Sequence, residues 1–375
     1  MVFMIKHYLY GPMISREEIY QKALRQDKIS VEESIFLYKS APLPELMNIA
    51  FRIRNTKVPG RFVGWQIDRN VNITNICFSQ CSFCNFCRKP GDKDTFITSL
   101  SEYKVKIEEL FEKGGNQLLL QGGMHPDLGL DFYTALFRDL KSGFPTLKLH
   151  ALGPPEIVHL ARKESISYES VLKELCDAGL DSLPGAGAEI LSDRVRKIVS
   201  PAKATATEWL DVMRIAHRIN LPTSATMMFG HIENTEERMI HLELIRQVQE
   251  EKPDGSHGFI SFIPWPFQDK GTRLATKYGV RNSVNMTEYI RMIAISRIML
   301  NNITNIQSSI LTTGKETAIM TLHGGANDLG SVMIEENVVR AAGSSRMFNA
   351  EQLQEIIREA GFIPRLRNQL YEPVE

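Results

Sequence analysis

The stretch NVNITNICFSQCSFCNFC, residues 70–87, decides the fold and chemistry of this chain of 375 residues. Its first part, residues 70–76, is a short run of apolar and β-branched residues that is typical of a strand. Directly after that run, Cys77, Cys81 and Cys84 follow with the spacing C-x3-C-x2-C. Because four of the five cysteines lie within this one loop, the pattern indicates metal binding in a reducing compartment rather than a disulfide framework.

Three thiolates in one short loop can hold one face of an iron–sulfur cube and leave the fourth iron without a protein ligand. The sequence therefore predicts a [4Fe-4S] cluster on Cys77, Cys81 and Cys84, with an open iron that binds S-adenosylmethionine (SAM). This loop resembles that of radical SAM enzymes, in which an aromatic residue usually precedes the third cysteine. Phe83 has this position and is therefore a candidate for cofactor binding.

A structural zinc knuckle is the alternative for this loop, because such sites are built from C-x2-C pairs. Cys84 and Cys87 form one such pair. Whether Cys87 is a fourth cluster ligand, a zinc ligand or a neighbour without a ligand role stays open. Cys176, among leucines at helical spacing, is expected in the core.

Outward from the loop, short apolar runs alternate with amphipathic stretches, which predicts repeated β-α units. The candidate strands lie at 70–76, 116–121, 147–152, 181–186, 223–229, 258–263, 305–310 and 326–333. Eight of them predict an α/β fold, a (β/α)8 TIM-type barrel, with an open doubly wound sheet as the alternative. We expect an N-terminal helical cap at 1–65, the barrel at 66–345 and a C-terminal helical extension at 346–375.

The charge balance argues against a polyanionic ligand. Lys plus Arg and Asp plus Glu number 44 each, so no net field draws the chain to nucleic acid or an anionic membrane. The N-terminal MVFMIKHYLYGPMIS has no signal-peptide pattern, and no uncharged apolar run approaches the roughly 18 residues of a membrane span. We therefore expect a cytoplasmic enzyme with a small-molecule substrate and no membrane insertion.

The predicted strand ends supply candidate ligand-binding residues, because barrel enzymes build their sites at the carboxyl ends of the strands. Gly122 and Gly123 permit close approach of a ligand to the backbone, as at the position that meets the methionyl group in radical SAM proteins. An ordinary tight turn is the alternative. Gln121 and Glu189 are further candidates for cofactor binding, the latter alternatively as a residue at a helix start.

The segment FGHIE at 229–233 resembles the element that radical SAM proteins place near adenine. Gly230 would permit close packing there, and His231 and Glu233 are candidates for ligand contact or proton transfer. A buried structural histidine is the alternative for His231.

Candidate substrate contacts come mainly from the loop after the sixth strand. Trp265 and Phe267 are aromatic residues that would stack on a ring, and Arg273 would pair with a carboxylate. His150 on the third strand is a further candidate. Packing on the barrel rim is the alternative for both aromatic residues.

Longer strings narrow the resemblance to one family. The chain is similar to the cyclic dehypoxanthine futalosine synthase family from about residue 15 to 370. The strings that carry the resemblance are LLLQGGMHPDLGLDFY, LHALGPPEI, LPGAGAEIL, TSATMMFGHIE, FISFIPWPFQ and GSVMIEENVV. Two residues depart from the family pattern: Cys87 replaces an aromatic residue, and Asn327 replaces what is commonly an Asp.

The resemblance implies a reaction of menaquinone biosynthesis by the futalosine route. A 5′-deoxyadenosyl radical would abstract the ribose C4′ hydrogen of dehypoxanthine futalosine, and the carbon radical would close a ring on the benzoate. A one-electron reductant such as flavodoxin or ferredoxin is the implied partner. The alternatives are an aminofutalosine synthase, an iron–sulfur electron carrier without SAM, and a zinc-stabilised binding barrel.

Overall fold

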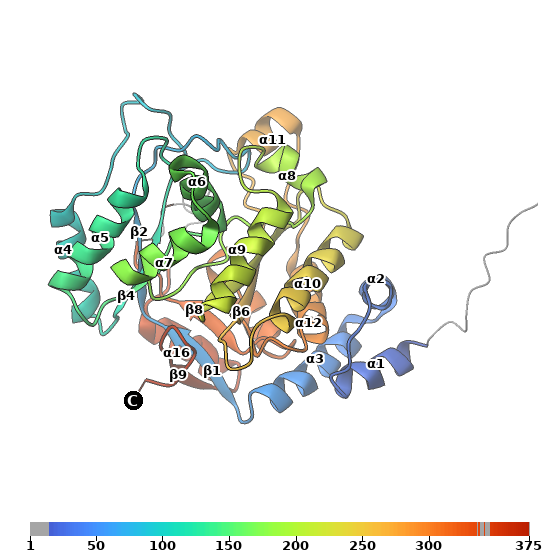
Figure 1. Ribbon diagram of the computed structural model, residues 1–375. Coiled ribbons are helices and arrows are strands. Elements are labelled where there is room, and N and C mark those ends of the chain that lie inside the picture. The colour runs from blue at the N-terminus through green and yellow to red at the C-terminus, as the bar shows by residue number, and fades with distance from the viewer. Residues whose placement is uncertain (1–14, 336, 338–340, 342–345, 375) are drawn as a thin grey trace, which may run out of the picture.

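The computed structural model describes residues 15–335, 337, 341 and 346–374 (Figure 1). The N-terminal segment MVFMIKHYLYGPMIS, in which no signal-peptide pattern was found, lies outside the described residues except for Ser15. Several helices begin where a Ser, Thr or Asn side chain accepts the amide of the third helical residue. Ser15, Ser99 and Asn234 are examples, and each forms a complete capping box with a Glu.

Parallel strands form the centre of the molecule. They belong to two three-stranded sheets of the barrel wall, namely β2 (Asp68–Asn72), β3 (Gln117–Gln121) and β4 (Lys148–Ala151), and β5 (Thr223–Phe229), β6 (Phe259–Pro266) and β7 (Asn305–Ile306). Single bridges at Ser182 and Leu183 join β4 to β5, and a bridge from Gln307 leads to β8 (Asp328–Ser331).

The ring closes between the segment after β8 and β2. The amide of Asn70 donates to the carbonyl of Ile334 at 3.0 Å, and the amide of Ile334 donates to Asp68 at 3.0 Å. The predicted TIM-type barrel is therefore confirmed. The strand predicted at 181–186 is reduced to two bridging residues, because Pro184 lacks an amide proton.

Two strands outside the predicted set extend the wall. β1 (Phe62–Gln66) lies between β8 and β9 (Ile363–Leu366), all in parallel. The C-terminal extension was expected to be helical, but only its first part is, in α16 (Ala350–Glu359). Pro364 and Arg365 obscured β9 in the sequence, and an edge strand tolerates both.

The N-terminal helices α1 (Arg16–Leu24), α2 (Val31–Ser40) and α3 (Leu43–Lys57) form the expected helical segment. They pack on the outside of the barrel against α10 (Thr235–Glu250) and α12 (Met286–Met299), not over its mouth (Figure 1). The division of the chain at residues 65 and 345 stays a prediction.

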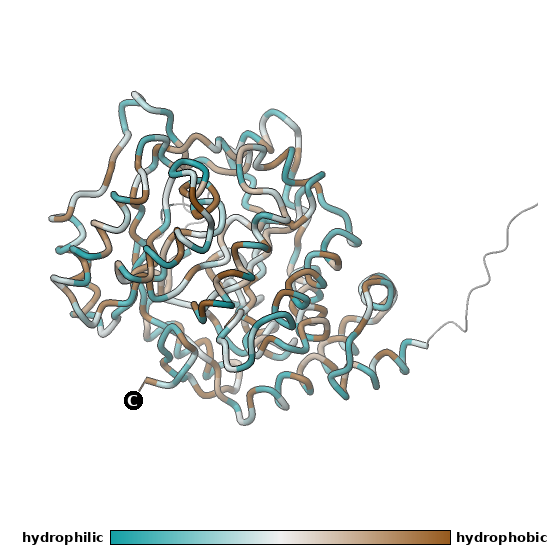
Figure 2. Tube along the Cα trace, in the orientation of Figure 1, coloured by the Kyte–Doolittle hydropathy of each residue, from teal (hydrophilic) through white to brown (hydrophobic). Residues whose placement is uncertain are grey.

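Further helices surround the barrel. They are α4 (Leu100–Glu112), α5 (Leu130–Gly143), α6 (Pro154–Glu164), α7 (Tyr168–Ala178), α8 (Asp193–Val199), α9 (Ala206–Arg218), α10 (Thr235–Glu250), α11 (Arg273–Tyr278), α12 (Met286–Met299), α13 (Ile310–Thr313) and α14 (Lys315–Leu322). Many show alternating polar and apolar stretches (Figure 2), as expected for helices that cover a barrel. Within the described ranges, none of the helices combines the length and apolar character needed to cross a bilayer.

The amino end of the barrel is closed by the C-terminal segment. Arg367 follows β9 and donates to Asp328 at 2.6 Å and to the side chain of Gln66 at 2.7 Å. All three residues are buried. A buried charge of this kind is stable only when it is paired, so the last residues of the chain form a polar floor to the barrel.

Candidate functional site

The cysteine loop lies at the carboxyl end of β2 and is held by several separate elements. The amide of Phe78 donates to the carbonyl of Met124 after β3 at 3.1 Å. The amide of Ser82 donates to Val199 at the end of α8 at 2.8 Å, and the carbonyl of Ser82 accepts from Leu274 in α11 at 2.6 Å. These contacts position the cysteines above the barrel interior.

Gly122 and Gly123 lie directly behind this loop. A Cβ at Gly122 would lie 2.8 Å from the carbonyl oxygen of Thr74, and one at Gly123 would collide with the carbonyl of Ile76. Both positions therefore need glycine because the end of β3 packs against the chain that enters the cysteine loop. This packing provides a structural reason for the pair, and their contact with a methionyl group stays a prediction.

Cys77, Cys81 and Cys84 line one cavity of about 150 Å³, together with Gly122 and Gly123. In the described part of the chain, no three His, Cys, Asp or Glu side chains surround a single metal ion. A [4Fe-4S] cluster does not require such convergence, because each thiolate binds a different iron atom. The donor set therefore fits the cluster better than it fits one zinc ion.

Cys87 lines the same cavity, but its thiol is already engaged. The sulfur lies 3.2 Å from the carbonyl oxygen of Cys77. A hydrogen bond from Cys87 to the Cys77 sulfur lowers the pKa of Cys77 to about 5, whereas burial raises the pKa of Cys81 to about 12. In the structure the Cys87 thiol thus donates to its neighbour, and its role beside a bound cluster stays a prediction.

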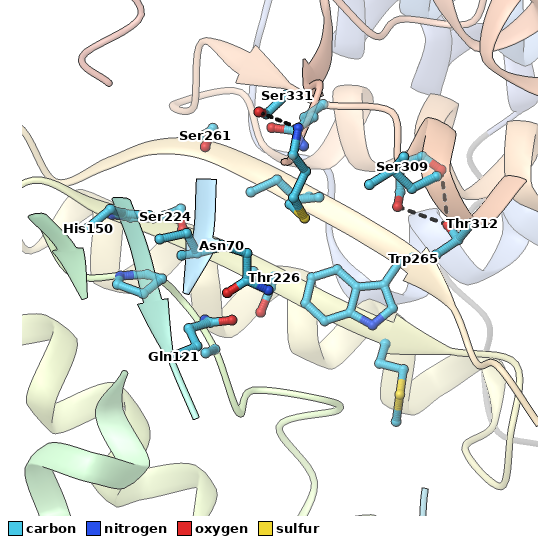
Figure 3. A pocket seen from close by; sticks show the side chains of 18 of the residues that line it. Asn70, Gln121, His150, Ser224, Thr226, Ser261, Trp265, Ser309, Thr312 and Ser331 are labelled. Carbon is cyan, nitrogen blue, oxygen red and sulfur yellow. Dashed lines mark hydrogen bonds between the residues drawn. The ribbon is translucent and has the colours of Figure 1, made fainter. Parts of the chain in front are cut away.

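A second and larger cavity of about 370 Å³ (Figure 3) lies in the barrel interior. Its lining includes Gln66 and Arg367 of the polar floor. The two cavities adjoin, since both are lined by Phe83, Cys84, Gln121, Ala186, Gly187 and Lys203. A ligand in the larger cavity can therefore extend to the cysteine loop. This shared wall includes two of the predicted cofactor-binding residues, Phe83 and Gln121.

Three predicted substrate residues line the larger cavity: His150, Trp265 and Phe267. The Trp265 indole lies on one side of the cavity, and His150 and Gln121 lie on the other (Figure 3). His150 Nδ1 lies 2.7 Å from the Ser182 hydroxyl, and burial lowers the pKa of His150 to about 4. His150 is therefore neutral at physiological pH and acts as a hydrogen-bonding group in the cavity wall.

Lys203 is a site residue that the sequence prediction missed. Its ammonium group lies 3.0 Å from Oε1 of Glu189, which was predicted to bind a ligand and also lines the larger cavity. Burial opposes the charge of Lys203, but Cys81, Glu189 and Glu156 together raise its pKa above the ordinary value. Lys203 follows α8 in a short loop with no strand before it, so no strand-end signal identified it in the sequence.

Glu156 is a second missed residue, in the first turn of α6. It lines the cavity that holds the cysteines, and its Oε2 atom has no hydrogen-bond partner within the described residues. Burial raises the pKa of Glu156 to about 7. Lys203 therefore pairs with Glu189, and the charge of Glu156 also stabilises its ammonium form.

His231 and Glu233 were predicted as catalytic residues, and their side chains have no exposed surface. Nδ1 of His231 accepts the amide of Ile232 at 2.8 Å, so its Nε2 carries the proton and donates to the carbonyl of Met228 at 3.0 Å. Neither His231 nor Glu233 lines the two cavities. These contacts support the structural alternative for His231, and a catalytic role has no support from them.

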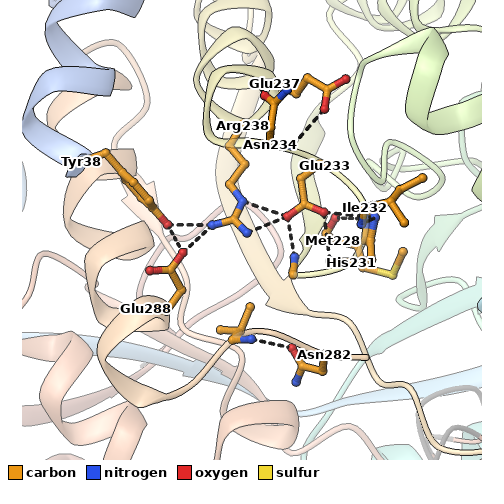
Figure 4. Close-up of polar contacts among 12 residues, drawn as sticks. Tyr38, Met228, His231, Ile232, Glu233, Asn234, Glu237, Arg238, Asn282 and Glu288 are labelled. Carbon is orange, nitrogen blue, oxygen red and sulfur yellow. Dashed lines mark hydrogen bonds and ion pairs between the residues drawn. The ribbon is translucent and has the colours of Figure 1, made fainter. Parts of the chain in front are cut away.

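Glu233 instead belongs to a buried polar network (Figure 4). It accepts the amides of Gly230 and His231 and pairs with Arg238 of α10 at 2.8 Å. The guanidinium of Arg238 also contacts Glu288 and the hydroxyl of Tyr38 in α2. The network therefore ties the loop after β5 to the N-terminal helices.

Three further residues lie outside both cavities. A Cβ at Gly230 would collide with Val284, so that glycine serves the packing of two loops. Arg273 donates to the carbonyl of Gln80 at 2.6 Å, where it fixes the cysteine loop instead of facing the substrate cavity. Asn327 is buried and accepts from Arg297 at 2.7 Å, so this departure from the family pattern lies in the barrel wall.

Comparisons with known proteins agree with this geometry. Residues 71–245 match the radical SAM superfamily, and residues 256–375 match the CofH/MqnC C-terminal region. Among solved structures, methylornithine synthase has a TM-score of 0.68 at 16% identity over 92% of this chain and 97% of that chain. The hydrogenase maturase HydG has a TM-score of 0.71 at 14% identity, over 95% of this chain and 76% of that chain. Both structures support the fold alone.

Curated relatives show the family. The cyclic dehypoxanthine futalosine synthase of Streptomyces coelicolor is 40% identical over 95% of this chain and 88% of its own length, and that of Halalkalibacterium halodurans is 39% identical over 96% and 95%. The 5-amino-6-(D-ribitylamino)uracil–L-tyrosine 4-hydroxyphenyl transferase of Archaeoglobus fulgidus is 40% identical over 87% and 93%. The cysteine loop, the closed barrel and these relatives lead to one conclusion: the chain belongs to the cyclic dehypoxanthine futalosine synthase family of radical SAM enzymes.

Proposed function

We propose that this enzyme cyclises dehypoxanthine futalosine in menaquinone biosynthesis, with a [4Fe-4S] cluster on Cys77, Cys81 and Cys84. The observation that carries the proposal is the pair of adjoining cavities, one lined by the three cysteines and one long, partly apolar and closed by a polar floor. With SAM bound, the cluster would supply the electron that splits SAM, and the carbon-centred radical released from SAM would take a hydrogen atom from the substrate.

The chain's own residues bind and orient the reactants. Phe83, Cys84 and Lys203 lie where the two cavities adjoin, and the Nζ atom of Lys203 lies 5.5 Å from the Phe83 ring centre. Lys203 provides a positive charge for the carboxylate of SAM, and the backbone at Gly122 and Gly123 provides polar groups beside it. Trp265 provides a flat apolar wall for the benzoate ring of the substrate.

A 4-hydroxyphenyl transferase is the second candidate function, because the Archaeoglobus fulgidus transferase is as similar to this chain, at 40% identity, as the Streptomyces coelicolor synthase. Two observations favour the cyclase. The two futalosine synthases are 39–40% identical over 95–96% of this chain, whereas a transferase that covers as much of it, that of Methanosarcina acetivorans, is 36% identical. The strings IPWPFQ and GSVMIEENVV also resemble the synthase family. The two activities use different substrates, so one experiment separates them.

The reconstituted enzyme is incubated anaerobically with SAM and dithionite, with either dehypoxanthine futalosine or L-tyrosine plus 5-amino-6-(D-ribitylamino)uracil. The proposed function predicts a product two hydrogens lighter than dehypoxanthine futalosine, together with 5′-deoxyadenosine. One hydrogen leaves to 5′-deoxyadenosine, and the other leaves as a proton and an electron. Product in the tyrosine reaction alone would replace the cyclase by the transferase.

A further inference from the structure

One face at the barrel mouth carries an excess of positive charge, although the whole chain has 44 cationic and 44 anionic side chains. The segment 270–281, KGTRLATKYGVR, contains four cations and no acidic residue. Lys270, Arg273, Lys277 and Arg281 are all exposed, as is Lys197 on α8. We call these five residues the basic face.

The charges of the segment 270–281 are not cancelled by neighbours. In the part of the chain that the structure describes, no carboxylate lies within salt-bridge distance of its four cations. Arg273 donates to a main-chain carbonyl, and Lys277 lies 5.4 Å from the ring centre of Tyr278. The basic face is therefore free to attract an anionic partner.

The basic face lies directly over the cysteine loop. The amide of Leu274 donates to Ser82 at 2.6 Å, and the side chain of Asn85 donates to the carbonyl of Lys270 at 2.9 Å. On the other side, Ser82 donates to the end of α8, and α8 and α11 lie near each other at the mouth (Figure 1). Among the described residues, this face therefore contacts the loop that carries Cys81 and Cys84.

We propose that the basic face docks a small acidic electron-carrier protein, which delivers the electron that the cluster needs. This inference rests on the proposed radical chemistry, because each turnover begins with a one-electron reduction. Complementary charge accelerates such encounters and aligns the partners, and the effect weakens as salt is added. The short path from this face to the cysteines makes the same position suitable for electron transfer.

The test compares two electron donors, reduced flavodoxin and dithionite. The variant Lys270→Glu/Lys277→Glu/Arg281→Glu reverses three exposed charges without touching either cavity. Its matched control, Lys104→Glu/Lys113→Glu/Arg138→Glu, makes the same change at exposed positions on α4, at its C-cap and on α5. We expect the first variant to lose about tenfold or more of the flavodoxin-driven rate, while its dithionite-driven rate and both rates of the control stay at the wild-type value.

Binding is measured separately, by the fluorescence anisotropy of oxidised flavodoxin at low and high salt. We expect the first variant to bind more weakly at low salt and the difference to disappear at high salt. Equal flavodoxin rates and equal binding in the two variants would overturn the docking proposal, as would a first variant that is impaired equally with both donors. A wild-type protein that binds flavodoxin but cleaves no SAM with dithionite would contradict the proposed function and leave the docking measurement intact.

Discussion

The ammonium group of Lys203 lies 3.0 Å from the carboxylate of Glu189, and both side chains are largely withdrawn from solvent. Lys203 also borders both cavities, so its charge acts on the cysteine loop and on the long cavity together. Loss of one partner of a buried ion pair leaves the other uncompensated, at a cost of about 3–5 kcal/mol.

Lys203→Met is expected to lower both the melting temperature and SAM cleavage. The double variant Lys203→Met/Glu189→Gln should recover most of the stability, because the unpaired charge is gone, but it should not recover cleavage. Thermal unfolding and 5′-deoxyadenosine formation measure the two effects separately. Wild-type cleavage by the double variant would remove Lys203 from the SAM site.

Replacement of Cys77, Cys81 or Cys84 by Ala should abolish the cluster, whereas Cys87→Ala should keep it. The thiol of Cys87 is engaged by Cys77, so its loss removes a hydrogen bond and no iron ligand. Iron and sulfide analysis and the electron paramagnetic resonance spectrum of the reduced protein report the result. Cys176→Ala is the control, and iron loss from Cys87→Ala would make Cys87 a ligand.

Trp265→Ala should separate radical formation from its use. The indole forms part of the wall of the long cavity and does not line the cavity that holds the three cysteines, so the cluster should stay intact. A less firmly held substrate reacts less efficiently, so the ratio of 5′-deoxyadenosine to cyclic product should rise several-fold. The exposed Phe96→Ala serves as control. An unchanged ratio and rate for Trp265→Ala would restrict Trp265 to packing.

Acid should destabilise the fold through three buried histidines. Burial lowers the pKa of His150 and of His217 to about 4, and that of His241 to about 3. The unfolded chain, with a histidine pKa near 6.5, therefore binds more protons than the folded chain between pH 6.5 and 4. The free energy of unfolding is therefore highest above pH 6.5 and decreases as the pH falls from 6.5 to 4.

Between pH 7.5 and pH 5, each of these histidines is expected to lower the free energy of unfolding by about 2 kcal/mol. Urea unfolding of wild type and His217→Gln at both pH values measures it, because the variant should show the smaller dependence on pH. If the free energy of unfolding of both proteins changes equally between these pH values, folding does not lower the pKa of His217.

Asn327→Asp should stabilise the barrel wall by about 1 kcal/mol. The side-chain oxygen of Asn327 accepts from Arg297, which is fully buried and otherwise contacts main-chain carbonyls. A carboxylate would give this guanidinium a counter-charge. The melting temperature reports the change, and a lower value would show that the lost hydrogen bond to Asn305 outweighs the new ion pair.

The parts of the site that sequence could predict are those made by neighbouring residues. The cysteine loop and the Gly122–Gly123 strand end follow from local spacing and from the rule that barrel sites form at strand ends. Lys203 and the role of Arg238 could not be inferred in this way. Arg238 meets Tyr38 from 200 residues away, and only the closed fold brings them together.

Local sequence patterns do not show which distant segments pair, and this also explains why some observed strands differ from the predicted ones. Residues 181–186 have the apolar character of a strand, yet only Ser182 and Leu183 make bridges to the neighbouring strands. β1 and β9 are short, and each depends on a partner about 300 residues away in sequence, which no local pattern indicates. His231 lies at a strand end as expected, but its two nitrogens are used by the backbone.

The position of β1 between β8 and β9 has a consequence for the synthesis of the chain. A ribosome releases Phe62–Gln66 early, but both strands that pair with it are made from residues after 327. At 5–20 residues per second, β1 waits roughly 15 to 50 s for its first neighbour. The nascent barrel therefore presents two open strand edges for that time, and a chaperone that covers such edges should raise the yield of folded enzyme.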